Sequence, residues 1–201
     1  MVSGVAAAWH DVILRYNALP FFHPKDMNMK QFSKRIAVTH WLVFLLVIAA
    51  LSLGLYLDAS ENTAQKLSLF PAHFLIGDTI LLLTLLRIYF RKKDGEPAPA
   101  NKNPLLNKLA AFVHYGLNIS VIAVAVSGIV TAVTSGVLEA ISAKDPGLIP
   151  DFSKVDAKEF HELFLAITVF LLAIHIAAAI YHQFLVKDNL MRRIMIKRFP
   201  D

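Results

Sequence analysis

The sequence of 201 residues contains no cysteine, and this absence excludes several kinds of site. Without a thiol the chain can form no disulfide, hold no cysteine-ligated iron–sulfur cluster and carry no haem attached through thioether bonds. What remains possible is a cofactor bound without covalent attachment, such as a b-type haem, or a metal site built from histidine and carboxylate ligands.

Charge is scarce as well. Only 17% of the residues are charged, 56% are hydrophobic, and the mean hydropathy is +0.55. This composition is too apolar for an ordinary soluble domain and indicates a membrane protein. The formal net charge is +5, yet we expect no nucleic-acid partner, because the placement of the basic residues has a simpler explanation.

Four long runs with few or no charges predict four membrane-spanning helices. About 20 apolar residues in a helix are long enough to cross the hydrocarbon core of a bilayer. We expect the spans to cover about residues 36–57, 67–90, 109–134 and 161–186. The predicted fold is therefore an all-α membrane protein, a four-helix transmembrane bundle over residues 31–201. We expect residues 1–30 to be a dispensable N-terminal extension, with a short interfacial helix as the alternative.

Lysine and arginine placement predicts the orientation of these spans. Sixteen of the 20 basic residues lie in the N-terminal segment, in the connection between the second and third spans and its flanks (Arg87 included), and in the C-terminal tail. Basic residues accumulate on the cytoplasmic side of membrane proteins. We therefore expect both termini to be cytoplasmic. The other four basic residues are expected outside: Lys66, Lys144, Lys154 and Lys158.

Histidines recur at matching depths in the predicted spans. His161 and His175 lie 14 residues apart, which in a helix means one face and about 21 Å along the axis. The directions of the other spans place His73 near the outer surface, level with His161, and His40 near the inner surface, level with His175. Imidazole is a common axial ligand of haem iron. Each pair therefore predicts one b haem between two helices; the alternative is hydrogen bonding between helices.

A spacing of 14 residues also recurs in the first three spans. The positions related in this way are His40 and Gly54, His73 and Arg87, and His114 and Gly128. Gly54 and Gly128 then lie at the depth of the outer haem, and Gly77 lies one turn after His73. The lack of a side chain at these positions would let a macrocycle approach the backbone. The alternative is that small residues simply let membrane helices pack closely.

Five further polar residues are candidates for more specific roles. Arg87 lies at the depth of the inner haem, where a guanidinium suits a haem propionate. His114 is expected to contact a propionate or a quinone, and His182 is expected to bind a quinone carbonyl or deliver its proton. Lys158, three residues before His161, is the candidate for attracting an anion to the outer haem. Asp78 interrupts the second span, where we expect it to form a hydrogen bond to a neighbouring helix, with a proton relay as the alternative.

Residues 32–198 resemble the bacterial di-haem cytochrome b561 proteins of the inner membrane. The motifs that carry this resemblance are His40-Trp41, His73-x3-Gly77 with Arg87, His161-Glu162, His175-x-Ala177-Ala178-Ala179, His182 and Lys187-Asp188-Asn189. The resemblance implies four membrane-spanning helices, two haem b groups held by the four paired histidines, and a quinone as electron partner. The short chain is most similar to the superoxide oxidase branch, which takes electrons from periplasmic superoxide and reduces ubiquinone. The basic residue at Lys158 also occurs in that branch.

Three functions follow as expectations. The first is a superoxide:ubiquinone oxidoreductase of the inner membrane, with lipid, quinone and superoxide as its partners. The second is an electron-transfer subunit that anchors a periplasmic dehydrogenase or hydrogenase, which would be a partner subunit. The third, from a different class, is a four-helix transporter that binds a metal ion through its histidines.

Overall fold

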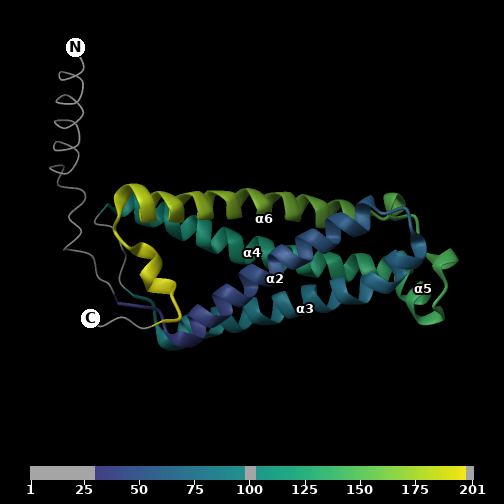
Figure 1. The fold of residues 1–201 in the computed structure, drawn as a ribbon, viewed down its shortest axis with the longest axis horizontal. Coiled ribbons are helices and arrows are strands. Elements are labelled where there is room, and N and C mark those ends of the chain that lie inside the picture. The colour runs from purple at the N-terminus through teal and green to yellow at the C-terminus, as the bar shows by residue number, and fades with distance from the viewer. Residues whose placement is uncertain (1–29, 98–102, 198–201) are drawn as a thin grey trace, which may run out of the picture.

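A computed structural model describes residues 30–97 and 103–197 of the chain. Figure 1 shows these residues as a bundle of long helices. All regular structure within the described ranges is helical, without a strand, so the all-α prediction is confirmed. Almost the whole of the expected N-terminal extension lies outside the described residues.

Four helices are long and apolar enough to cross a membrane, as the sequence predicts. They are α2 (Lys34–Ala59), α3 (Thr63–Asp94), α4 (Pro104–Ser135) and α6 (Asp156–Ile180), which continues as the π-helical turn η4 (Tyr181–Val186). Each helix is longer than the span expected from hydropathy. The additional turns carry polar and charged residues, which belong in the interfacial regions rather than in hydrocarbon.

Side-chain caps and a glycine fix the ends of the middle helices. The side chain of Asn62 accepts a hydrogen bond from the backbone N–H of Gln65 (3.0 Å) at the start of α3. Asn103 does the same for Leu105 (2.9 Å) at the start of α4. Gly136 ends α4 with a positive φ of 85°, a conformation that costs glycine little. These polar caps explain why both helices begin before their apolar runs.

The bundle is built from two antiparallel helix pairs. α4 packs against α6, α2 packs against α3, and α3 also contacts α4. Many large apolar side chains remain on the surface; Leu75, Phe112 and Phe170, for example, are 65–69% exposed. A soluble protein rarely exposes such continuous apolar surface. A lipid environment accounts for it, because hydrocarbon covers these side chains without cost.

The connection between α4 and α6 covers one end of the bundle. It contains three short helices: α5 (Val137–Ala143), η2 (Pro146–Leu148) and η3 (Phe152–Lys154). Val137 is fully buried, and Phe152 contacts Phe70 of α3 at 5.5 Å between ring centres. Phe70 in turn stacks on Phe74, next to His73. An apolar cap therefore shields the α3 side of this end, which we call the outer end after the predicted orientation.

The C-terminal segment crosses the opposite, inner end, from α6 to the start of α2 (Figure 1). It contains the 3-10 helix η5 (Leu190–Ile194). The indole N–H of Trp41 donates a hydrogen bond to the carbonyl of Ile194 (3.1 Å). The backbone N–H of Phe32 donates to the carbonyl of Arg193 (2.9 Å). The beginning and the end of the described chain are thus joined at the inner end.

Candidate cofactor sites between the helices

The four histidines predicted as ligands lie in two pairs. The ring centres of His73 (α3) and His161 (α6) are 6.5 Å apart, and those of His40 (α2) and His175 (α6) are 6.2 Å apart. The structure therefore brings together the histidines that the sequence places at the same depth. Both pairs use α6, and in each the second imidazole comes from the α2–α3 half of the bundle.

The spacing within each pair fits one metal atom between two imidazoles. A metal–imidazole nitrogen bond is about 2.0–2.1 Å for zinc, and a ring centre lies roughly 1.2 Å behind its nitrogen, so opposed rings on one metal have centres about 6.4 Å apart. The observed separations of 6.5 and 6.2 Å agree with this value. The ring separation in both pairs therefore matches that of two imidazoles bound to one metal atom.

The protein itself leaves polar atoms unsatisfied at both pairs. The Nδ1 atoms of His40 and His73 are buried and have no hydrogen-bond partner. Buried polar atoms normally find partners, and an exception calls for an explanation such as a bound ion or cofactor. Each pair therefore contains one histidine whose Nδ1 atom makes no hydrogen bond. Hydrogen bonding between helices, the alternative role of these histidines, does not account for it.

His161 is oriented by a hydrogen bond that the sequence does not predict. Its Nδ1 lies 2.9 Å from the carbonyl oxygen of Val124 and 3.3 Å from the hydroxyl of Ser127. Ser127 also donates to the Val124 carbonyl (2.9 Å). A carbonyl oxygen can only accept, so Nδ1 carries the proton and Nε2 is left as a metal-binding atom. No sequence signal reports the position of a backbone carbonyl.

Two of the predicted glycines face the outer pair. A Cβ atom at Gly54 would lie 3.1 Å from Cε1 of His73, and one at Gly128 would lie 3.0 Å from Cε1 of His161. Both distances are shorter than ordinary van der Waals contact, so a side chain at either position would push on an imidazole. A Cβ at Gly77 would meet nothing within 4 Å. The close approach of a macrocycle to these glycines stays a prediction.

A third imidazole and a guanidinium accompany the inner pair. The ring centre of His114 is 5.2 Å from that of His175. Arg87 is close enough to His40 and His175 to interact with both electrostatically, and its buried Nε has no hydrogen-bond partner. A buried guanidinium with an unused donor fits an anionic ligand group such as a carboxylate. The inner pair thus offers the features expected around a haem propionate.

His182 lies at the inner end of α6, in η4, and contacts a buried carboxylate. Its Nδ1 is 2.5 Å from Oδ2 of Asp188, which is 7% exposed. The other carboxylate oxygen of Asp188 accepts from the backbone N–H of Leu190 (3.0 Å). Lys187 and Asn189 have positive φ angles of 58° and 57°, which turn the chain back toward η4. The sequence predicts a role for His182 but gives no sign that Asp188 is its partner.

Lys158 lies one turn before His161, but carboxylates surround its ammonium group. Its Nζ is 2.7 Å from Glu162 of the same helix and 3.3 Å from Asp58 at the end of α2. This group of three charges has a net charge of −1 and connects α2 to α6 beside the outer pair. Attraction of an anion by Lys158 stays a prediction, and the structure shows that two carboxylates offset its charge.

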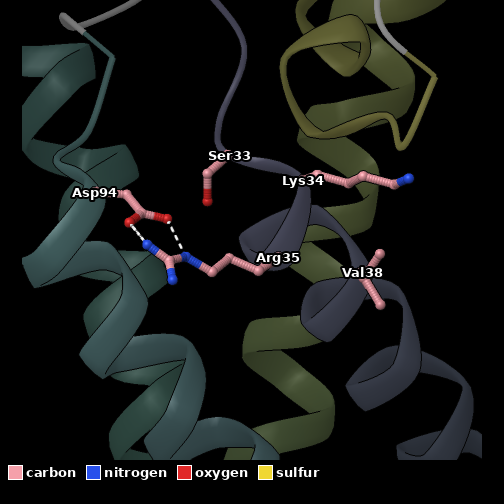
Figure 2. A pocket seen from close by; sticks show the side chains of 5 residues that line it. All are labelled: Ser33, Lys34, Arg35, Val38 and Asp94. Carbon is pink, nitrogen blue, oxygen red and sulfur yellow. Dashed lines mark hydrogen bonds and ion pairs between the residues drawn. The ribbon is translucent and has the colours of Figure 1, made fainter.

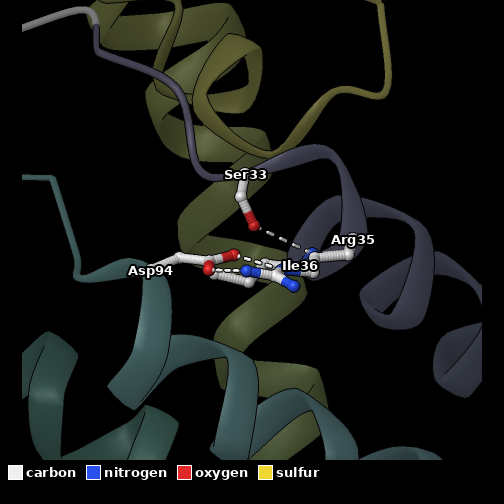
Figure 3. Close-up of polar contacts among 4 residues, drawn as sticks. All are labelled: Ser33, Arg35, Ile36 and Asp94. Carbon is white, nitrogen blue, oxygen red and sulfur yellow. Dashed lines mark hydrogen bonds and ion pairs between the residues drawn. The ribbon is translucent and has the colours of Figure 1, made fainter.

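A shallow pocket of about 640 Å³ lies at the inner ends of α2 and α3, apart from both histidine pairs. Figure 2 shows its lining residues, Ser33, Lys34, Arg35, Val38 and Asp94. The guanidinium of Arg35 donates hydrogen bonds to both carboxylate oxygens of Asp94. The hydroxyl of Ser33 accepts from the backbone N–H of Ile36 (3.4 Å) and so caps α2 (Figure 3). These contacts fasten the start of α2 to the end of α3.

The histidine pairs suit a metal ion for which a cofactor, and not the protein, supplies most of the ligands. Protein side chains alone usually supply three or four ligands to a metal ion. Within residues 30–97 and 103–197, no group of three or more His, Asp or Glu side chains is placed to hold one. Two opposed imidazoles are, however, the axial ligand set of a haem whose macrocycle provides the other four nitrogens. The residues present therefore fit haem at both pairs.

Comparison with known proteins agrees with this reading. The family model described as prokaryotic cytochrome b561 matches residues 31–197, which confirms the resemblance expected from the sequence. "Cytochrome b561 homolog 1" of Escherichia coli K12 is 28% identical over 178 residues, covering 85% of this chain and 99% of the relative. "Probable superoxide oxidase CybB" of Yersinia pestis is 30% identical over 167 residues, covering 79% of this chain and 92% of the relative.

Proposed function

The chain belongs to the prokaryotic cytochrome b561 family of membrane electron-transfer proteins, and we propose that it carries electrons from periplasmic superoxide to ubiquinone in the bacterial inner membrane. Membership of this family implies that it binds haem b. The number of haems and the identities of donor and acceptor are part of the proposal. The observation that carries it is the pair of matched ring separations, 6.5 Å and 6.2 Å, at two depths along α6.

In this proposal His73 and His161 hold the outer haem, and His40 and His175 hold the inner one. Bound haem supplies one-electron redox chemistry. The residues provide its position and surroundings. An imidazole of each pair would ligate the iron from either helix, and the hydrogen bond from His161 to the Val124 carbonyl would hold the His161 ring in place. Arg87 would bind a propionate of the inner haem.

His182 and Asp188 are proposed to supply protons at the ubiquinone site. Two superoxide ions, one ubiquinone and two protons give two oxygen molecules and one ubiquinol, so each turnover needs two protons at the inner side. Asp188 accepts from Nδ1 of His182, which leaves Nε2 to hold and release a proton toward the quinone. His114, 5.2 Å from His175, is proposed to contact the quinone or a propionate.

Charge placement supports the proposed orientation. The inner end carries basic residues on α2 and α3 and in the C-terminal segment, such as Arg35, Lys92 and Arg192. Acidic residues predominate near the outer pair, as in the group formed by Asp58, Lys158 and Glu162. Because basic residues accumulate on the cytoplasmic side of membrane proteins, this placement supports the proposal that both termini are cytoplasmic. The proposed domain extends over residues 31–201, with residues 1–30 as an extension.

Superoxide as the donor is supported by the relative from Yersinia pestis, whose name states a probable superoxide oxidase. A second candidate is an electron-transfer subunit that anchors a periplasmic dehydrogenase or hydrogenase. The cap formed by α5, η2 and η3 would be its docking surface. The excess of carboxylates around Lys158 suits a cationic protein partner better than an anionic small molecule, and this observation favours the second candidate.

Stopped-flow spectroscopy of the purified protein separates the two candidates. The haem-loaded protein is mixed with superoxide, with and without a soluble ubiquinone, and haem reduction and ubiquinol formation are followed. We expect fast haem reduction that superoxide dismutase abolishes, followed by reoxidation only when quinone is present. A protein with both haems that superoxide does not reduce would refute the proposed donor and favour the anchoring subunit.

A further inference from the structure

Asp78 is an acidic residue at the middle of a membrane span. It is the only Asp, Glu, Lys or Arg within residues 36–57, 67–86, 109–134 and 163–186. It lies 15 residues after the first residue of α3 and 16 before the last, so half of a long membrane helix separates it from either surface. Its side chain is nevertheless exposed on the outside of the bundle. Ionisable groups at this depth are expensive, and usually face another protein group or water.

Asp78 belongs to a regular ridge along α3. Four large side chains of this ridge are 49–69% exposed: Leu75, Leu82, Leu85 and Tyr89. Together with Asp78 they are spaced three, four, three and four residues apart. This is the spacing by which two helices pack along a common seam, in which a single polar residue fixes the register. Figure 1 shows α3 along one edge of the bundle, and the exposure of these side chains leaves the ridge open to a partner in the membrane.

We propose that two copies of this chain associate through α3, with Asp78 of one copy hydrogen-bonded to Asp78 of the other. All copies of a membrane protein have the same orientation, so a two-fold axis between them runs along the membrane normal. Residues at the same depth in two parallel helices then meet. Asp78 therefore faces its own equivalent, and each leucine of the ridge packs against the same leucine of the second copy.

The chemistry of the Asp78 carboxyl group favours a second copy of the chain as the partner of this ridge. A carboxyl group surrounded by hydrocarbon is more stable neutral than charged, and a neutral carboxylic acid offers one donor and one acceptor. Two such groups satisfy each other with two hydrogen bonds, which no lipid chain can do. His73 and His161 stay within each copy, so this association does not depend on the proposed haem or quinone chemistry.

The lack of cysteine makes the test direct. A Leu82→Cys variant carries the only thiol of its chain and places it on the ridge. Phe170→Cys is the matched control, because Phe170 is similarly exposed but lies on α6 (65% against 59%). We expect mild oxidation in native membranes to link Leu82→Cys into a disulfide-bonded dimer and to leave Phe170→Cys monomeric.

Substitution of Asp78 then tests the polar contact. Asp78→Leu combined with Leu82→Cys should reduce the cross-linked fraction severalfold. Asp78→Asn should retain it, because an amide also offers a donor and an acceptor. Haem content per chain should be equal in all variants. Cross-linking of Leu82→Cys no stronger than in the control, cross-linking to a different protein, or an Asp78→Leu yield equal to that of the parent would each overturn the proposal.

Discussion

Adding one methyl group at Gly128 or Gly54 should weaken binding of the outer haem selectively. The new Cβ would lie 3.0 Å from His161 in the first case and 3.1 Å from His73 in the second. Favourable carbon–carbon contacts begin near about 3.5 Å, so each ring must move by roughly 0.5 Å. The rings can rotate away when no cofactor holds them. The substitution therefore destabilises mainly the haem-bound state.

Overpacking of this kind typically costs about 1–3 kcal/mol. Since about 1.4 kcal/mol corresponds to a factor of ten, affinity for the outer haem should fall roughly 5- to 150-fold. Gly128→Ala should have the larger effect, because its Cβ would also lie 3.2 Å from Nδ1 of His161 and so disturb the hydrogen bond to Val124. Binding of the inner haem should be unchanged.

Haem titration of the purified variants, followed by absorbance, measures both affinities. Gly116→Ala is the matched control: its Cβ would lie 3.1 Å from a methyl group of Leu171, a flexible leucine rather than a predicted ligand. It should bind both haems normally. If Gly54→Ala and Gly128→Ala also bind two haems with the affinity of the parent, these glycines do not border a haem ligand and the outer site is misplaced.

Three further predictions test other parts of the account. Lys158→Glu adds a third carboxylate beside the outer pair, so the reduction of haem by superoxide should slow severalfold at low ionic strength. If the reduction of haem by quinol slows equally, the substitution acts through the structure instead. Asp188→Asn should slow ubiquinone reduction by about 10-fold or more, because His182 loses the carboxylate that orients it for proton transfer. An unchanged rate of ubiquinone reduction would show that His182 and Asp188 do not supply the protons. Reporter fusions at residues 99 and 149 should give cytoplasmic and periplasmic signals respectively, and matching signals would refute the orientation.

The spans and the depths of the histidines could be predicted because both depend on simple periodicities. Hydrocarbon thickness sets the length of an apolar run, and 14 residues return a helix almost to the same face. For this reason the sequence alone suggests that His73 lies level with His161 and His40 level with His175. The same reasoning explains the small errors at the helix ends, because polar caps such as Asn103 lengthen a helix beyond the hydrocarbon.

Contacts that depend on how the helices rotate and how loops fold could not be predicted. The hydrogen bond from His161 goes to a backbone carbonyl of α4, which has no signature in sequence. Asp58 and Lys158 are 100 residues apart and meet only because the end of α2 lies beside the start of α6. Asp188 reaches His182 because two residues with positive φ reverse the chain. Sequence periodicity describes the helices, whereas these contacts follow from the geometry between them.

The central claim is that two haems lie between the pairs His73–His161 and His40–His175. Measuring haem per chain, together with low-temperature absorption spectra, in the parent protein and in His73→Ala and His161→Ala tests it most directly. The account predicts two low-spin b haems in the parent and one in each variant, with the inner haem still reducible by quinol. Two low-spin haems in either variant, or a single haem in the parent, would contradict it.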